Sequence, residues 1–411
     1  MLDEVPNGWV NGLLNSCVAK VFGGGTPSRK NADFWNGEIF WASVKDFTKF
    51  HPTQTQETIT DAGLTHSSAK VVKAGTLIVA TRMAVGSARV FEVDVAINQD
   101  LKAIEVSKNC DRDFLNFWLE CNRPLVEAQA TGTTVKGISQ SALLGLPLLV
   151  PPLDEQQRIA EILTSVDETI RVTEAVIAQT ERVKLGVMEN LLTGGLGSDA
   201  IANGEVPDGW ELCLLGNLSS KKGMQTGPFG SQLKASEYVE HGPISVVMPK
   251  EIIGGTIQFD RCSKIDEIKA EQLTKHFLKT GDLLFARRGD LSKISMFDGQ
   301  EEQAICGTGC LRCRPNLEQV DPQFLAKILT MPSSIEWLET NAVGQTMLNL
   351  NTNIISDLPL IIPPKVEQQR VVNALDSIDE DISVKRALLS QTKRLKQGLM
   401  SDLLTGRKRV T

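Results

Sequence analysis

The chain has 411 residues but few aromatic side chains, a single tyrosine, four histidines and no long apolar run. A membrane-spanning helix needs about 18 to 20 consecutive apolar residues, and no stretch of the sequence approaches that length. The first four residues, Met-Leu-Asp-Glu, lack the basic and apolar start of a secretory signal. These absences predict a cytoplasmic protein that does not associate with a membrane.

Catalytic signatures are missing as well. No Gly-Lys-Ser or Gly-Lys-Thr phosphate-binding loop occurs, so we expect no nucleotide-driven motor. A self-contained adenine methyltransferase would carry Asn or Asp before a Pro-Pro pair and an aromatic ring after it. The two Pro-Pro pairs lie instead in Val-Pro-Pro-Leu at Pro151 and in Ile-Pro-Pro-Lys at Pro363. Asp260, Glu267 and Lys269 have the residue types of a nuclease site, but they lie in an ordinary amphipathic charged segment. We therefore expect a chain that is not an enzyme.

The eight cysteines are scattered, which favours free thiols in a reducing compartment over a disulfide framework. Cys306, Cys310 and Cys313, with Cys262 as a fourth ligand, have the residue type of a zinc site. However, Cys310 and Cys313 fall where the first half of the chain has residues 101–104 in an expected strand. We interpret them as small core residues rather than metal ligands.

Basic side chains are outnumbered, with 43 Lys and Arg against 50 Asp and Glu and a formal net charge of −7. This balance argues against a protein that coats nucleic acid along its whole surface. It leaves room for a narrow basic face, because binding depends on local clustering of charge. Charge alone does not decide between these classes.

An internal repeat is the strongest signal in the sequence. Pro-Pro-x-x-Glu-Gln-Gln-Arg begins at residue 151 and again at residue 363, and Leu-Leu-Thr-Gly closes the two copies at Gly194 and Gly406. Both ends are 212 residues apart, so no insertion or deletion separates the copies. Val-Pro-Asn/Asp-Gly-Trp begins each half, at residues 5–9 and 206–210. Each half is therefore an entry turn, a globular unit and a long helix.

Each repeated segment predicts a long helix, because prolines precede it, a carboxylate lies in its first turn and a glycine follows its last apolar residue. Residues 155–192 would form a rod of about 57 Å at about 1.5 Å per residue. The expected seam positions alternate in steps of four and three: Ile159, Leu163, Val166, Ile170, Thr173, Ile177, Thr180, Lys184, Val187 and Leu191, and then Val371, Leu375, Ile378, Ile382, Lys385, Leu389, Thr392, Lys396, Leu399 and Leu403. Matched heptads predict a coiled coil in which the two copies pair. The alternative is an ordinary helical hairpin inside a single core.

The globular units share a framework but differ in their loops. In the first, a glycine-rich loop at 23–30 precedes a strand at 39–42, and a buried strand at 75–82 ends in an arginine. A packing helix at 114–125 and an exit strand at 146–150 follow. The second unit has a loop at 223–231, strands at 244–247, 281–288 and 358–362, and a Gly-Gln-Thr segment at 344–346 that matches 132–134. Two copies of one α/β scaffold with unlike loops suit a protein that recognises two different things.

With this doubled motif, the chain resembles the specificity subunit of Type I restriction-modification systems. The resemblance covers essentially the whole sequence and implies an α/β (α+β) fold with two target-recognition domains and two long antiparallel coiled-coil helices. The resulting division is 1–150, recognition domain 1; 151–194, helix 1; 195–205, linker; 206–362, recognition domain 2; 363–406, helix 2; and 407–411, a basic tail. Val366 replaces Asp154 at the second helix start, so only the first copy has the residues of a capping box.

The resemblance also implies partners. Each domain would bind one half of a bipartite double-stranded DNA sequence, and the helices would serve as spacer and as docking surface for two methylation subunits. Restriction subunits would join through those methylation subunits. S-adenosylmethionine would be their cofactor, with none in this chain. The alternative from another class is a non-catalytic protein-interaction scaffold without DNA readout.

Candidate contacts follow from residue type. Glycine-rich loops let backbone approach phosphates, arginine pairs with guanine, and glutamine pairs with adenine. The candidate DNA contacts are Gly24, Thr26, Ser28, Arg29, Lys30 and Arg82 in the first domain, and Gln225, Thr226, Gly230, Ser231, Lys234, Arg287, Arg288 and Gln345 in the second. The candidate partner contacts are Glu155, Gln156 and Arg158 at the first helix start, and Glu367, Gln368 and Arg370 at the second.

Overall fold

The computed structural model describes residues 5–132, 135–196, 204–299, 303–344 and 348–410. The chain divides into two compact units, which we call unit 1 (Met1–Val176 with Lys385–Thr411) and unit 2 (Ile177–Val384). Each unit therefore contains one globular domain and parts of both long helices. Among the described residues, no helix is long and apolar enough to span a bilayer.

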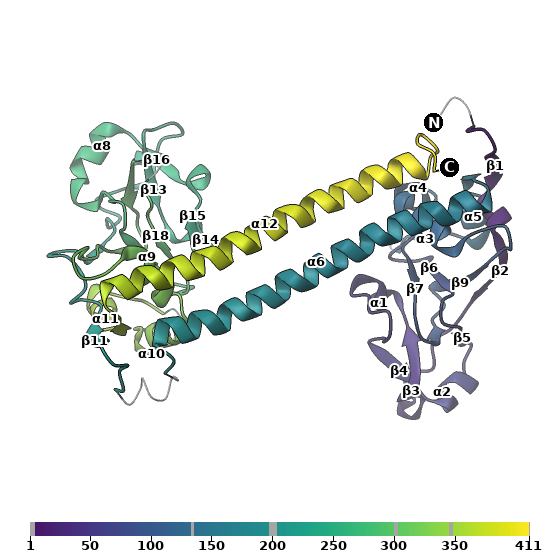
Figure 1. Cartoon of the computed structure of the whole chain (residues 1–411), viewed down its shortest axis with the longest axis horizontal. Coiled ribbons are helices and arrows are strands. Elements are labelled where there is room, and N and C mark those ends of the chain that lie inside the picture. Colours follow the sequence, from purple (N-terminus) through teal and green to yellow (C-terminus); the bar gives the residue numbers. More distant parts are fainter. Residues whose placement is uncertain (1–4, 133–134, 197–203, 300–302, 345–347, 411) are drawn as a thin grey trace. The chain divides into compact units, whose positions relative to one another are not determined.

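Two four-stranded sheets form the frame of unit 1 (Figure 1). Their orders are β2-β9-β6-β7 and β4-β3-β8-β5, and all neighbours are antiparallel except β3 and β8. All four residues of β6 are buried, as expected for the apolar run before Arg82. The bounds are β2 Val18–Gly23, β3 Trp35–Ala42, β4 Glu57–Ile59, β5 Lys70–Val72, β6 Leu77–Ala80, β7 Ala88–Val90, β8 Val95–Ile97 and β9 Leu101–Val106.

Helix α3 (Arg112–Cys121) packs a face of phenylalanine, leucine and tryptophan into the core of unit 1. The Asp111 side chain caps it by accepting hydrogen bonds from two backbone amides. The single helix expected over 114–125 is interrupted at Asn122, and α4 (Arg123–Ala128) follows. Pro124 explains the break, because it has no amide hydrogen to donate to the preceding turn. The remaining elements are β1 Val10–Leu13, α1 Val44–Thr48, α2 Asp61–Thr65, α5 Gln140–Leu144 and β10 Pro147–Val150.

Unit 2 repeats the frame, with sheets β12-β20-β17-β18 and β16-β13-β19. Strand β13 is parallel to β19, as β3 is to β8 in unit 1. A short hairpin, β14–β15, is added beside β18. The bounds are β11 Glu211–Leu214, β12 Gln225–Thr226, β13 Ile244–Val247, β14 Ile252–Ile253, β15 Thr256–Ile257, β16 Ser263–Ile265, α8 Glu267–Gln272, β17 Leu283–Ala286, β18 Ile294–Met296, β19 Gln303–Cys306, β20 Cys310–Cys313, α9 Pro322–Leu329, α10 Pro332–Asn341, α11 Thr352–Ser356 and β21 Pro359–Ile362.

The cysteines considered as zinc ligands are core residues, as the sequence predicts. Cys306, Cys310 and Cys313 are buried in β19 and β20, and all three are free thiols. Burial raises the pKa of Cys306 and of Cys313 to about 12, so both thiols stay protonated at neutral pH.

The two long helices are α6 (Leu153–Thr193) and α12 (Lys365–Leu403). Every expected seam position in both helices is buried or half-buried. In unit 1 they run antiparallel, because Lys396 pairs with Asp167 at 2.9 Å and Lys393 pairs with Glu174 at 2.7 Å. In unit 2, Lys184 pairs with Asp379, which is the repeat equivalent of the Lys396–Asp167 pair. The predicted coiled-coil pairing is confirmed.

A glycine in the left-handed region follows each helix and lies against an entry turn. Gly194 has a φ of 61° and Gly406 a φ of 73°. A Cβ on Gly406 would lie 2.5 Å from Pro6, and one on Gly194 would lie 2.5 Å from Pro207. These contacts place the end of α12 in the core of unit 1 and the end of α6 in the core of unit 2.

Candidate nucleic-acid interface

Four loops of unit 1 meet at one edge of sheet β2-β9-β6-β7. Because β9 is antiparallel to both neighbours, the ends of β2 and β6 lie beside its start. The loops are 23–27 after β2, 98–100 before β9, 81–87 after β6, and 131–138, of which 133 and 134 lie outside the described residues. The joining contacts are Gly25 N to Ile97 O at 3.0 Å, Thr26 Oγ1 to Gln99 Oε1 at 2.6 Å, Thr81 N to Asp100 O at 2.8 Å, Ile138 N to Thr81 O at 2.9 Å and a bridge between Arg82 and Gly137. We call this the four-loop site of unit 1.

Unit 2 builds the same site from loops 227–231, 307–309, 287–293 and 343–350. Of the last loop, residues 345–347, including the predicted contact Gln345, lie outside the described part of the chain. The joining contacts are Gly227 N to Cys310 O at 2.9 Å, Thr308 Oγ1 to Pro228 O at 3.0 Å, Arg287 N to Gly309 O at 2.7 Å, Leu350 N to Arg287 O at 2.8 Å and a bridge between Arg288 and Asn349. By these contacts Arg288 corresponds to Arg82, and Arg287 corresponds to Thr81.

Arg82 and Arg288 are exposed at equivalent positions of the two sites. The Arg82 guanidinium lies 3.8 Å from Asp100, and 62% of its side chain is exposed. Arg287 is half-buried, donates to Asn349 Oδ1 at 3.1 Å and lies over the ring of the exposed Phe229. The site thus presents one outward arginine in each unit, and in unit 2 a second arginine is held by its neighbours.

Gly24 is needed for packing of the loops themselves. A Cβ on Gly24 would lie 1.8 Å from the carbonyl oxygen of Ile97, and one on Gly227 would lie 1.9 Å from that of Gly307. The absence of a side chain at both positions therefore permits the approach of two protein loops. This contact between loops explains the need for glycine at both positions, and no bound phosphate is required to explain it.

Arg29 is engaged elsewhere in unit 1. Its guanidinium makes two hydrogen bonds to Glu57 of β4 and lies 3.7 Å from the ring of Trp35. The hydrogen bond from Arg29 lowers the pKa of Glu57, and the same bond raises the pKa of Arg29. Ser28 accepts the Trp35 indole N–H through its carbonyl oxygen, and the side chain of Lys30 is exposed.

Gln225 and Thr226 lie in β12, half-buried, rather than in a loop. The Gln225 side-chain oxygen accepts from the buried guanidinium of Arg312 at 3.1 Å, which gives this amide an internal partner. The predicted contacts Gly230, Ser231 and Lys234 are exposed in the segment that follows. The backbone amide of Lys234 donates to Glu237 at 2.5 Å.

Gln156 and Gln368 have an internal role in place of the surface role expected for them. Both are fully buried. The Gln156 oxygen accepts from Asp111 N at 2.8 Å, and the Gln368 oxygen accepts from Asp321 N at 2.7 Å. Each amide nitrogen donates to two backbone carbonyls. Because all these partners lie in the same unit, the two amides hold a long helix to its own globular domain.

Glu155 is also turned inward, and the basic tail reaches it. Its carboxylate accepts from the Trp9 indole at 2.9 Å and from both Nε and Nη2 of Arg409 at 2.7 Å. Burial alone would raise the pKa of Glu155, but the hydrogen bonds from Arg409 and Trp9 outweigh it and lower that pKa. Of the other candidates, Arg158 and Arg370 are exposed and Glu367 is half-buried. The tail therefore clamps the start of α6 to the entry turn.

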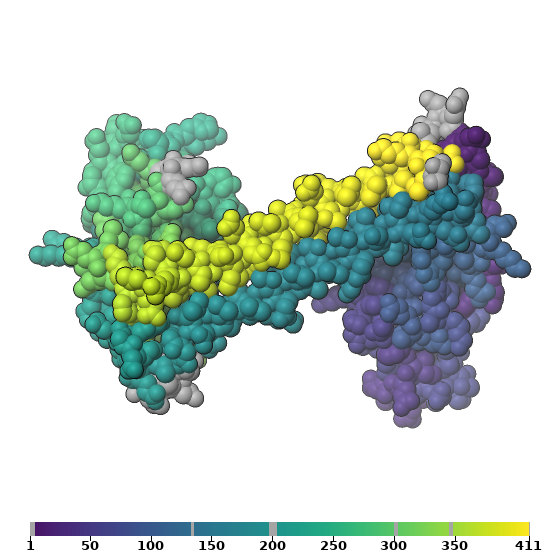
Figure 2. All heavy atoms as spheres, viewed as in Figure 1, coloured from purple at the N-terminus to yellow at the C-terminus, as the bar shows by residue number. Residues whose placement is uncertain are grey.

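A second apolar row lies on each helix, outside the predicted seam. The row comprises Val172, Val176 and Val183 on α6 and Val384, Leu388 and Leu395 on α12, all between 41% and 62% exposed. Each residue has its equivalent 212 positions away. In Figure 2, the face of α6 and α12 that is turned to the viewer is largely uncovered by other atoms. The identical 4 and 7 residue spacing in both copies was the signal available in the sequence.

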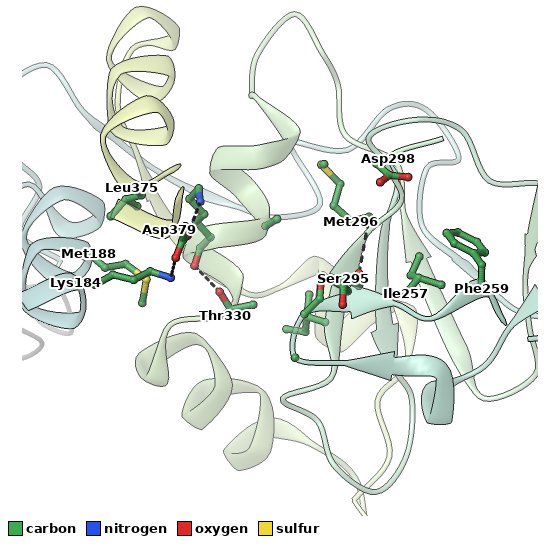
Figure 3. Close-up of a pocket in the computed structure, with 16 residues that line it drawn as sticks. Lys184, Met188, Ile257, Phe259, Ser295, Met296, Asp298, Thr330, Leu375 and Asp379 are labelled. Atoms are coloured by element: carbon green, nitrogen blue, oxygen red, sulfur yellow. Dashed lines mark hydrogen bonds and ion pairs between the residues drawn. The ribbon is translucent and has the colours of Figure 1, made fainter. Parts of the chain in front are cut away.

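A pocket of about 460 Å³ lies within unit 2, between the β14–β15 hairpin, β18, α9 and both long helices (Figure 3). Met188, Leu375, Ile257, Phe259 and Met296 give it apolar walls. Three of its charged residues form ion pairs: Lys184 pairs with Asp379, and Lys327 lies 3.9 Å from Asp379 and 2.7 Å from Asp376 of α12 outside the pocket lining. None of the residues predicted to contact DNA lines this pocket.

Comparison with known proteins connects this arrangement to one family. The profile described as "Type I restriction modification DNA specificity domain" matches residues 6–182 and 230–394. The MjaVIII specificity subunit of a Type I restriction enzyme from Methanocaldococcus jannaschii is 26% identical over 318 residues, 75% of this chain and 73% of the relative. The EcoR124I/EcoR124II specificity subunit of Escherichia coli is 31% identical over 172 residues, 40% of this chain and 43% of the relative.

Solved structures share the fold over the whole length. The S subunit of a Type I restriction-modification system from M. genitalium has a TM-score of 0.58 at 16% identity, covering 100% of this chain and 98% of that one. A chain from a structural study of assembly and conformational transition in a Type I system has a TM-score of 0.61 at 17% identity, covering 98% of both chains. With two matching segments that span most of its sequence, the chain belongs to the family of Type I restriction-modification specificity subunits.

Proposed function

We propose that this chain is the non-catalytic subunit that selects the DNA sequence for a Type I restriction-modification complex, with each unit recognising one half of a bipartite target. The observation that carries the proposal is the repeated four-loop site, in which Arg82 and Arg288 lie exposed at equivalent places. The surrounding loops differ in sequence between the units, which suits two different half-sites.

The chemistry of the site favours a duplex as ligand. An exposed arginine can pair with O6 and N7 of guanine or bind a phosphate, and it keeps its charge at any physiological pH. The amide oxygens of Gln99 and Asn349, in the adjoining loops, accept from Thr26 and Arg287, so these side chains hold the loops of the site together. Binding through a few such cations is compatible with a net acidic chain, because affinity depends on local charge.

We propose that the apolar rows on α6 and α12 bind two copies of one partner, the methylation subunit. The six exposed valine and leucine side chains are aligned in rows rather than scattered, and aligned apolar surface of this kind favours a site that a partner covers. Since the rows repeat at one offset, two identical helices could bind them in equivalent ways. These partners would supply S-adenosylmethionine and the methyl transfer to an adenine flipped from the stack. Restriction subunits would join through them.

The DNA proposal predicts separable losses. In the complex assembled with its methylation subunits, we expect Arg82→Ala to weaken discrimination in one half-site by about 1–3 kcal/mol, and Arg288→Ala to do so in the other. Lys20→Ala, on exposed strand surface outside the loops, is the control. Competition binding against single-base variants of the target at fixed salt gives the measurement.

A matched domain exchange tests the same assignment. Replacing residues 10–150 by those of a relative should change one half of the N6-methyladenine motif and leave the other unchanged. A complex that retains no duplex, or that binds duplex without any dependence on salt, would favour the scaffold without DNA readout.

The docking proposal predicts that Val176→Glu combined with Leu388→Glu abolishes copurification of the methylation subunits, since two carboxylates would be buried against apolar surface. Ala178→Glu combined with Ser390→Glu is the matched control, because these exposed residues are also repeat equivalents but lie off the rows. Equal copurification with both pairs would contradict the assignment. Helical content by circular dichroism checks that both proteins are folded.

A further inference from the structure

Met83 has an unusual backbone conformation in the 81–87 loop. Its φ is +62°, in the left-handed region that side chains other than glycine rarely adopt. The amide of Ala84 donates to the carbonyl of Arg82 at 2.7 Å, which closes a three-residue γ-turn around Met83. Such a turn with positive φ is strained for an L-residue.

Unit 2 avoids this strain. Gly289 occupies the equivalent position, one residue after Arg288, with a φ of +78°. Glycine adopts this conformation without a Cβ penalty. The fold therefore accepts glycine here, and unit 1 instead carries a long side chain at a residue with a similarly positive φ.

Contacts of the Met83 side chain within the protein do not offset the backbone strain. Met83 is 73% exposed, the most exposed of the large apolar residues in the described part of the chain. The turn is held by backbone bonds, including Met83 N to Lys136 O at 3.2 Å. Those bonds would remain with glycine, so what methionine adds is an apolar group directed outward from the four-loop site.

We infer that Met83 is a specificity-determining residue that contacts the 5-methyl group of a thymine in the half-site recognised by unit 1. This inference rests on the proposed function. Met83 directly follows Arg82, so a base-edge or phosphate contact by the arginine brings the thioether to the same groove. Apolar contact with the thymine methyl is how proteins distinguish this base in the major groove. An unbranched thioether adjusts its shape to such a contact, whereas holding it rigid between two bases would freeze its rotatable bonds.

The test combines a protein change with a DNA change. The assembled complex carries wild-type chain or Met83→Gly, and the duplex carries thymine or deoxyuridine at each thymine position in turn. We expect one deoxyuridine, in the half-site of unit 1, to weaken wild-type binding about 3- to 5-fold, the effect of one buried methyl group. Met83→Gly should bind the thymine duplex with a similar loss and be insensitive to that deoxyuridine.

The free Met83→Gly chain should unfold at a temperature equal to or above that of wild type, so weaker binding cannot be attributed to misfolding. Unchanged affinity in Met83→Gly would overturn the inference. Sensitivity to deoxyuridine that persists in Met83→Gly would also overturn it. A loss of affinity in Met83→Gly that no deoxyuridine substitution reproduces would overturn it too, and would indicate instead that the side chain inserts between two bases. Loss of half-site discrimination in Arg82→Ala reports separately on the proposed function. Absence of discrimination in the wild-type complex would instead refute that function.

Discussion

Buried polar side chains account for most of the residue-scale differences between expectation and structure. The Glu-Gln-Gln sequence at the start of each helix is polar and repeated, which is the pattern of a docking surface. Gln156 and Gln368 are nevertheless buried and hydrogen-bonded to backbone groups of their own domains. A repeated polar residue has the same sequence signature whether its partners lie in its own chain or another, so the sequence could not separate these roles.

His276 is a buried base whose charge the fold disfavours. It is 2% exposed, and burial, with Lys275 and Arg312 nearby, lowers its pKa to about 4 from 6.5. Between pH 6.5 and pH 4 the unfolded chain therefore binds more protons than the folded one, so stability falls as the pH falls through this window. Above pH 6.5 the histidine is neutral in both the folded and the unfolded chain, so none of this stability is lost.

We expect His276→Leu to reduce the loss of unfolding free energy between pH 6.5 and pH 4 by up to about 3 kcal/mol, because its side chain cannot be protonated. Urea unfolding at a series of pH values measures this slope. His241→Gln, at an exposed histidine of the same unit, is the control. A slope that stays the same in His276→Leu would show that other groups cause the acid sensitivity.

Single arginines illustrate what sequence could and could not locate. Arg82 is recognisable because it closely follows a buried strand, and it is exposed at the four-loop site. Its contact with DNA stays a prediction. Arg29 follows a glycine-rich loop and looked equivalent, but Glu57 binds it from a strand 28 residues away. A pairing of this kind depends on sheet register, which local pattern does not determine.

At the scale of elements, the coiled coil was the most predictable part of the molecule. Its seam follows from the heptad alone, since burial of one helix face needs only periodic apolar residues. The break after α3 and the added β14–β15 hairpin were not foreseen. The hairpin depends on two consecutive glycines with positive φ, Gly254 and Gly255, in a segment without strong strand periodicity.

The clamp of Trp9, Glu155 and Arg409 at the start of α6 gives a prediction about stability. Arg409→Ala would leave the Glu155 carboxylate, whose side chain is 6% exposed, without its cation. We expect a loss of about 1–3 kcal/mol in unfolding free energy, below the value for a fully buried pair because the arginine is partly exposed. Denaturant unfolding measures it. Lys408→Ala, at a lysine with a 75% exposed side chain, is the control, and equal midpoints for the two variants would contradict the clamp.

For the whole molecule, the repeat predicted the division into two alike domains and two helices, and family membership supports it. The sequence did not reveal that each compact unit takes in the far end of the other half's helix. Each unit holds the end of that helix through a glycine–proline contact, between Gly406 and Pro6 in unit 1 and between Gly194 and Pro207 in unit 2. The first two residues are far apart in the sequence, and a linker separates the second two.

If the helices set the half-site spacing, lengthening both should change the DNA target. Inserting one heptad at the equivalent positions after Ala178 and Ser390 adds about 10 Å to each helix and preserves the seam. We expect the methylated motif to gain about three base pairs between its half-sites, at about 3.4 Å per base pair. Sequencing of N6-methyladenine gives the result. A single insertion in one helix, which breaks the matched pairing, should abolish methylation, and an unchanged spacing with both insertions would refute the role of the helices.

The exposed valine and leucine rows also bear on how the protein must be made. A chain produced in excess of its proposed partners would display both rows to water, where such surfaces favour self-association. The supply of this chain and of methylation subunits would then have to be balanced, with newly made chains captured before they meet one another. Solubility on coexpression, and its loss on expression alone, would be the outward sign of that requirement.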